Sequence, residues 1–376
     1  MRARGVDVDQ LARAAAISNS RLHEMMQGER KPSIVQVQKL ASKLAVPPYA
    51  FYADKYYPEE DPLLDFRWKD VRQFKPGLLA PQFERFFGLV ELIKDINDDV
   101  NIDLQSASLE ESPEQIAAAM RAKLRLDDIQ FTATSASLFY AEFRKRIEEL
   151  GVFVIHTSLK EHRLRGFALF DNSMINNIIG INTFHQNHAS RSFTLAHELA
   201  HIMLKNSGVS DTLRVRNDVE RFCNRFAISL LAPRRSIVQD FDDFEEFTDY
   251  DDAVDVARTL STKYRISISA LLLRAVELGY TRRANFAIWR SNFKNDDWLD
   301  AITEIRRRPK DQKPDPGKNA IGRFGLRLSR LLRNGIKSGK ISEFDVHEGS
   351  GLSLKTINSM LRATDAQIQQ AQQEVE

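Results

Sequence analysis

The residues best able to do chemistry stand near the middle of the chain, in the stretch FTLAHELAHIM at residues 193–203. His197, Glu198 and His201 form the pattern H-E-x-x-H there. Residues four apart project from the same face of a helix, so the two imidazoles can bind one metal ion. Glu198 stands beside that position and can accept a proton from a water that the ion activates. The pattern predicts a catalytic metal site, with Zn²⁺ expected and Mn²⁺ as an alternative.

A catalytic site of this kind needs a third protein ligand and an open fourth position. Glu220, nineteen residues after His201, is the leading candidate because it begins an apolar helix that ends at Pro233. The apolar face of that helix would pack on the first helix, and Glu220 would then point at the histidines. Asp211 and Asp218 are the alternative third ligands.

The same pattern also occurs in buried helices that bind no metal. Three features favour the metal site: the helix contains no breaker, apolar strands precede it, and a helix bearing a carboxylate follows it. No motif identifies the group that would stabilise an oxyanion, although four cationic or imidazole side chains are near in sequence: His162, Arg165, His185 and His188.

The elements around the motif can be predicted from periodicity. Apolar, β-branched runs predict strands at 151–157, 165–171 and 176–182. The third strand, NNIIGIN, is expected to pair with an extended peptide substrate, which makes Ile179 and Ile181 the predicted substrate-binding residues.

Helical periodicity covers most of the remaining chain. Helices are expected at 8–15, 19–28, 34–45, 83–100, 112–124 and, as a pair, 256–280. Ser112 with Glu114 and Gln115 suggests a capping box at the start of one of them. The proline-rich, charged segment 306–319 is the clearest linker, and no internal repeat is evident.

Composition limits the class of protein. The chain has 376 residues, of which 43% are hydrophobic and 28% charged, which is typical of soluble proteins. Its apolar runs are too short to cross a bilayer, so no membrane partner is expected. A single cysteine and the lack of a secretory signal indicate a cytoplasmic protein. Because the net charge is only +2, any affinity for nucleic acid must come from local patches.

Several segments resemble the ImmA/IrrE-type metallopeptidases in order and spacing: RGFALF, NIIGIN, SRSFTLAHELAHIML and VERFCNRFAISLLAP. The resemblance covers roughly residues 140–280. It implies an α+β, mostly helical, zincin-like fold with His197, His201 and Glu220 as zinc ligands and Glu198 as the general base. It also implies the cleavage of a transcriptional repressor, which would release stress-response or mobile-element genes.

The N-terminal segment is similar to the Cro/C1-like helix-turn-helix that precedes the peptidase in many longer members. Its recognition helix would present four side chains to DNA: Asn19, Ser20, Arg21 and Glu24. The usual first helix would lie upstream of Gly5, where only MRAR stands, so an incomplete module or a misplaced start is expected. Competing interpretations are a small helical domain that binds protein, a DNA-binding regulator whose zincin fold is a sensor or scaffold, and an antitoxin-like partner.

These observations divide the chain into five parts. They are a helix-turn-helix at 1–57, a linker and amphipathic helix at 58–110, the peptidase domain at 111–290, a linker at 291–319 and a basic helical extension at 320–376. In the extension, four arginines lie three or four residues apart: Arg323, Arg327, Arg330 and Arg333. A solvated face is the expected explanation, and no nucleic-acid role is assigned to them.

Overall fold

The structure is a computed structural model of the chain. It describes residues 8–44, 76–97, 103–159, 164–170, 177–184, 186–205, 208–211, 218–244, 247, 249–292 and 315–373. Contacts divide the chain into two compact units. The first comprises residues 1–92 with 348–351, and the second comprises residues 93–347 with 352–376. The α+β, mostly helical, zincin-like fold class is confirmed.

The first unit begins with three short helices, as the sequence predicts: α1 (Val8–Ala15), α2 (Asn19–Met26) and α3 (Ile34–Leu44). They pack around a small apolar core that includes Leu11, Leu22 and Leu40. The long helix α5 (Pro76–Ile96) begins seven residues before the predicted amphipathic helix. The expected linker begins at residue 58, and residues 58–75 lie outside the described residues.

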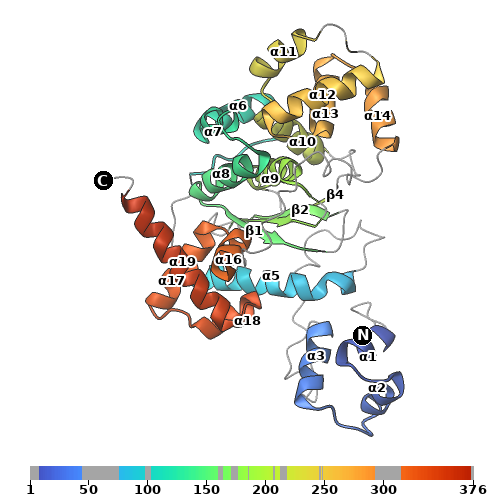
Figure 1. Ribbon diagram of the computed structural model, residues 1–376, viewed down its shortest axis with the longest axis vertical. Helices are drawn as coiled ribbons and strands as arrows, with labels where there is room; N and C mark the ends of the chain where they lie inside the picture. Colours follow the sequence, from blue (N-terminus) through green and yellow to red (C-terminus); the bar gives the residue numbers. More distant parts are fainter. Residues whose placement is uncertain are drawn as a thin grey trace. The chain divides into compact units, whose positions relative to one another are not determined.

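A mixed sheet lies in the second unit, next to the H-E-x-x-H helix (Figure 1). In the described residues it has four strands in the order β1-β3-β2-β4. The strands are β1 (Phe153–Thr157), β2 (Leu164–Leu169), β3 (Ile178–Asn182) and β4 (Gly208–Asp211). β3 is parallel to β1 and antiparallel to β2, and β4 is antiparallel to β2. Three of these strands are at the predicted positions.

Both faces of the sheet are covered, which explains why its strands read as continuous apolar runs. Val154, Ala168 and Ile179 belong to the same core as the helices that pack on one face, α8 (Ala136–Glu149) and α9 (His188–Met203). On the other side of β1, Phe153 lies against the guanidinium of Arg327 from the C-terminal helices.

Seven further helices surround the sheet and its core: α6 (Pro113–Lys123), α7 (Leu126–Gln130), α10 (Asp218–Leu231), α11 (Arg234–Asp242), α12 (Tyr250–Tyr264), α13 (Ile268–Leu278) and α14 (Arg283–Asn292). Ser112 is the N-cap residue of α6, but its side chain accepts no capping hydrogen bond. The predicted capping box is therefore wrong, and Pro113 at the first helical position is the local start signal.

Four C-terminal helices follow: α16 (Pro316–Phe324), α17 (Leu326–Lys337), α18 (Glu343–Ser350) and α19 (Leu354–Gln373). α16 begins inside the expected linker, because the Asp315 side chain accepts hydrogen bonds from the Gly317 and Lys318 amides and caps the helix. The buried carboxylate of Glu148 accepts hydrogen bonds from the Leu326 and Arg327 amides at 2.9 and 3.1 Å. These bonds fix the start of α17 to α8.

The four arginines are divided between two helices, Arg323 on α16 and the other three on α17, and they are only partly the solvated face that the sequence suggests. Arg327 lies 4.9 Å from the Phe153 ring centroid, and Arg333 pairs with Asp365 of α19. These cations therefore contribute to packing.

Candidate metal centre

The helix that carries the motif is α9. Asn187 caps its N-terminus by accepting a hydrogen bond from the Ser190 amide at 2.8 Å. His197 and His201 are buried, with exposed fractions of 6% and 2%. Their Nε2 atoms lie 3.2 Å apart. The four-residue spacing thus brings two buried imidazole nitrogens together, as the sequence predicts.

Glu220 approaches the histidines from the first turn of α10. The packing of α10 against α9 follows from its apolar stripe, in which Phe222, Phe226 and Leu230 are buried. One Glu220 carboxylate oxygen lies 3.2 Å from His197 Nε2, and the other lies 3.3 Å from His201 Nε2.

The spacing of these three donors fits a metal ion. Zinc binds nitrogen and oxygen at about 2.0–2.1 Å in a tetrahedral arrangement, which places neighbouring ligand atoms about 3.3 Å apart. The separations of 3.2, 3.2 and 3.3 Å among His197, His201 and Glu220 match that value. The three side chains therefore lie close enough together to hold a single ion.

The electrostatics of the centre are those of an acid paired with imidazoles. Burial acts to raise the pKa of Glu220, but hydrogen bonds from His197 and His201 outweigh it and lower that pKa to about 2. Burial acts to lower the pKa of His201, whereas hydrogen bonds with Cys223 and Glu220 raise it well above its ordinary value. Glu220 is therefore held as a carboxylate, which is the form that binds a metal.

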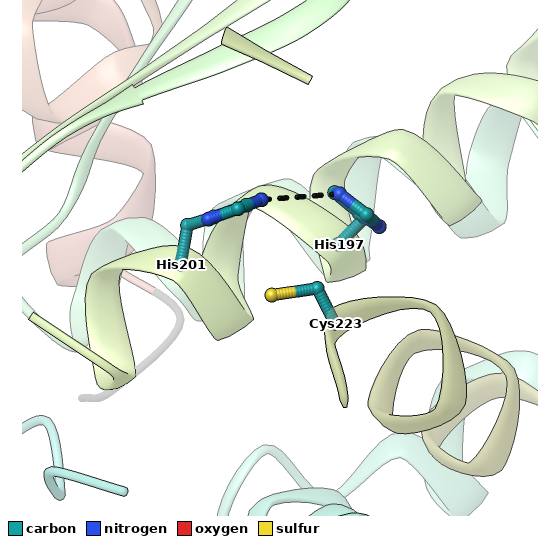
Figure 2. A group of neighbouring side chains, drawn as sticks. All are labelled: His197, His201 and Cys223. Carbon is teal, nitrogen blue, oxygen red and sulfur yellow. Dashed lines mark hydrogen bonds between the residues drawn. The ribbon is translucent and has the colours of Figure 1, made fainter. Parts of the chain in front are cut away.

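Cys223 is a further donor that the sequence analysis missed. His197, His201 and Cys223 form a buried group whose ligand atoms all lie within 4.8 Å of one another. Figure 2 shows the thiol of α10 beside the two imidazoles of α9. The sequence contains a signal that could have identified this donor. Cys223 follows Glu220 by three residues, so the two side chains share a face of α10. Burial raises the pKa of the Cys223 thiol, which disfavours the thiolate that would bind a metal.

We expect the cobalt-substituted protein to show no sulfur-to-cobalt charge-transfer absorption. Each imidazole nitrogen lies 3.2 or 3.3 Å from an oxygen of Glu220, and this favours the carboxylate over the thiol as the third ligand. Absorption spectra of the wild type and a Cys223→Ser variant, each with one equivalent of Co²⁺, check this. Since Cys223 is the sole cysteine, a charge-transfer band that the substitution removes would identify the thiolate as a ligand.

Glu198 is fully buried on α9, next to strand β2. A Cβ atom added at Gly166 of β2 would lie 2.9 Å from Glu198 Oε1 and 2.6 Å from Thr194 Cγ2. The Glu198 carboxylate therefore occupies space that only glycine leaves open on that strand.

The Gly166→Ala substitution is expected to lower the rate of peptide hydrolysis and to leave metal binding intact. The new methyl group displaces Glu198, and a displacement of about 1 Å of a catalytic group can cost about 100-fold in rate. Kinetics with a quenched fluorescent peptide and measurement of bound metal check this. Gly322→Ala is the matched control, because a Cβ there meets nothing within 4 Å. Full activity of Gly166→Ala would show that the space left by Gly166 is not needed to position Glu198.

Ile179 and Ile181, the predicted substrate-binding residues, do not serve as expected. Both side chains are fully buried in the core. Both edges of β3 are occupied, by β1 on one side and β2 on the other, so no peptide can add to it. The prediction is wrong because strand order is a tertiary property that the pattern of one strand does not contain.

The other predicted candidates lie apart from the three donors. Asp218 is exposed and pairs with Arg221, and Asp211 is the last residue of β4. His188 begins α9, nine residues before His197, which is about 13 Å along a helix. Arg165 lies on β2 beside Gly166. His162 and His185 lie outside the described residues.

The four predicted DNA contacts lie on α2. Asn19, Ser20 and Arg21 are exposed in its first turn. Asn19 donates a hydrogen bond to Asp9, and Glu24 pairs with Arg30 at 2.8 Å. The structure thus groups these side chains on one short helix, and two of them already have partners within the module.

One comparison with known proteins gives a match. The family model Peptidase_M78, described as IrrE N-terminal-like domain, matches residues 147–276. The match runs from the end of α8 into α13 and so includes the sheet, the H-E-x-x-H helix and Glu220. No curated protein matches the chain. The family match supports an ImmA/IrrE-type peptidase domain in this region, with a metallopeptidase-type function and a protein substrate.

Proposed function

We propose that this protein is a zinc-dependent endopeptidase that cleaves a transcriptional repressor. The observation that carries the proposal is the convergence of His197, His201 and Glu220 at ligand spacing, with Glu198 adjacent on α9. The repressor substrate rests on the family resemblance, and it would place the protein in the cytoplasm.

The four residues would have two different roles in the proposed hydrolysis. His197, His201 and Glu220 would hold the ion. A zinc ion bound there would polarise a peptide carbonyl and lower the pKa of a water molecule to near neutrality. Glu198 would accept a proton from that water and pass it to the departing amine. Manganese can occupy the same donor set, so the identity of the ion is part of the proposal.

The substrate is better placed at β4 than at β3. β4 pairs with β2 along one edge, and no strand of the described residues pairs with its other edge. An extended peptide could add to that edge through main-chain hydrogen bonds. No helix in the described residues is long and apolar enough to cross a membrane.

Metal removal and reconstitution test the peptidase. The protein is stripped with a chelator, dialysed, and supplied with Zn²⁺ or Mn²⁺ in separate samples. Hydrolysis of a mixed library of quenched fluorescent peptides should vanish in the stripped protein and return with one equivalent of the native ion. Hydrolysis that persists in metal-free protein would overturn the proposal.

A second function is favoured by the N-terminal module. α1 and α2 are joined by three residues, and the first turn of α2 is exposed, which fits a helix-turn-helix that binds DNA through residues 1–57. A peptidase that also binds DNA could act on repressors bound at an operator. Arg21→Ala should then weaken binding of duplex DNA without any effect on peptide hydrolysis.

A further inference from the structure

A three-residue turn of one backbone type occurs both in the N-terminal module and near the C-terminus. In the first, Ala16 has a φ of 57°, Ile17 follows, and the Ser18 side chain accepts a hydrogen bond from the Arg21 amide. In the second, Gly351 has a φ of 68°, Leu352 follows, and Ser353 Oγ accepts from the Thr356 amide at 3.2 Å. Each turn joins two helices, α1 to α2 and α18 to α19.

The buried positions of the two segments also correspond, at a constant offset of 335 residues. Leu11, Ala15 and Leu22 are buried in the first segment, and Val346, Ser350 and Ile357 are buried at the equivalent positions of the second. The two segments therefore share a backbone conformation and a pattern of burial, although few of their residues are identical.

A third turn of this type shows what distinguishes a binding helix from a structural one. Arg265 has a φ of 57°, Ile266 is buried, and the Ser267 side chain caps α13 by accepting from the Ala270 amide. However, Ile268 and Leu271 at the start of α13 belong to the peptidase core. The turn alone therefore does not indicate a binding site. What distinguishes a helix that can bind a ligand is that the helix after the turn is exposed.

The second helix of the C-terminal segment is exposed along one face. Lys355, Arg362 and Gln369 are exposed, and Asn358 is partly exposed. Their spacing of three, four and seven residues puts them on the same face of α19, because seven residues make about two helical turns. Arg and Lys side chains recognise guanine, and Asn and Gln recognise adenine, at base edges in the major groove. Asn358 is held in place by donating to Glu343 Oε2 at 2.9 Å.

The positive charge near this segment comes from the helices that precede it. Residues 318–342, which include most of α16 and all of α17, have seven Lys or Arg and no acid, whereas residues 343–373 have two Lys or Arg and four acids. Arg333 and Lys337 pair with Asp365. Lys318 and Lys340 are exposed. In DNA-binding proteins, exposed Lys and Arg side chains around the recognition helix contact phosphates and supply the salt-dependent part of the affinity for DNA.

We propose that residues 343–373 form a second helix-turn-helix and that the exposed face of α19 binds duplex DNA in the major groove. This site is separate from the proposed metal centre and from residues 1–57. A chain with both modules would contact DNA at two places, which raises its overall affinity through the linkage of the two sites.

Fluorescence anisotropy with a labelled mixed-sequence duplex of about 30 base pairs, long enough for two half-sites one helical turn apart, tests the proposal. The full chain is titrated at several salt concentrations. The Lys355→Ala/Arg362→Ala variant is compared with Lys145→Ala/Arg235→Ala, which removes equal charge from exposed positions on α8 and α11. All four side chains are exposed, and circular dichroism verifies that each variant is folded.

We expect the α19 variant to lose at least about tenfold in affinity and to show a smaller salt dependence, whereas the control variant binds as the wild type does. Equal affinity of the two variants would overturn the proposal. So would an absence of DNA binding by the wild type, or a preference for single-stranded RNA of the same sequence. Arg21→Ala reports on the N-terminal module separately, so failure of one site is distinguishable from failure of the other.

Discussion

The Glu198→Gln variant is expected to keep its metal and to lose about 10²–10⁴-fold in the rate of peptide hydrolysis, the usual contribution of a general base. Glutamine has nearly the same shape as glutamate but cannot accept the proton. Glu198 is fully buried between α9 and β2, with its position fixed by the clearance above Gly166, so the amide should occupy the same space.

The measurement is kcat for a cleaved peptide together with the metal content of the purified variant. Glu142→Gln, an exposed position on α8, is the matched control and should behave as the wild type. A Glu198→Gln protein that hydrolyses peptides at the wild-type rate would remove Glu198 from the mechanism. Loss of metal together with activity would instead assign it a structural role.

The Glu220→Ala variant is expected to lose more than about 100-fold in zinc affinity. Residues that only orient metal ligands are each worth about 10–100-fold, and Glu220 supplies a donor itself. Its oxygens lie 3.2 and 3.3 Å from the two imidazole nitrogens, and Cys223, three residues further along α10, is another potential ligand beside them.

Competition titration against a chromophoric zinc chelator measures this affinity. Asp218→Ala is the matched control, because Asp218 is an acid on the same turn whose exposed side chain pairs with Arg221. We expect that control to bind zinc as the wild type does. If Glu220→Ala retained full affinity and Cys223→Ser lost it, the third ligand would be the thiolate.

The way the candidate ligands come together could largely be predicted from the sequence because the information is local. Once a helix is assumed, the four-residue spacing of His197 and His201 puts both on one face. The apolar stripe of α10 then determines which face of that helix packs on α9, and so that Glu220 is directed at the histidines. Pro233 likewise marks the end of α10. The helices and three of the strands follow from the same short-range periodicity.

Other features depend on contacts between distant segments and could not be predicted in this way. The central position of β3 arises from pairing with both β1 and β2, which the strand's own residues do not encode. The importance of Gly166 appears only when α9 packs over β2. The correspondence of Ala16 with Gly351 lies in backbone conformation rather than in residue type.

The most direct test of the central claim compares new protein N-termini in host lysate. One sample receives purified wild-type protein with zinc, and the other receives Glu198→Gln with zinc. The account predicts a cleavage that appears only with the wild type, in a DNA-binding repressor. Identical N-termini in the two samples, with zinc bound to both proteins, would contradict the proposal that this centre hydrolyses peptide bonds.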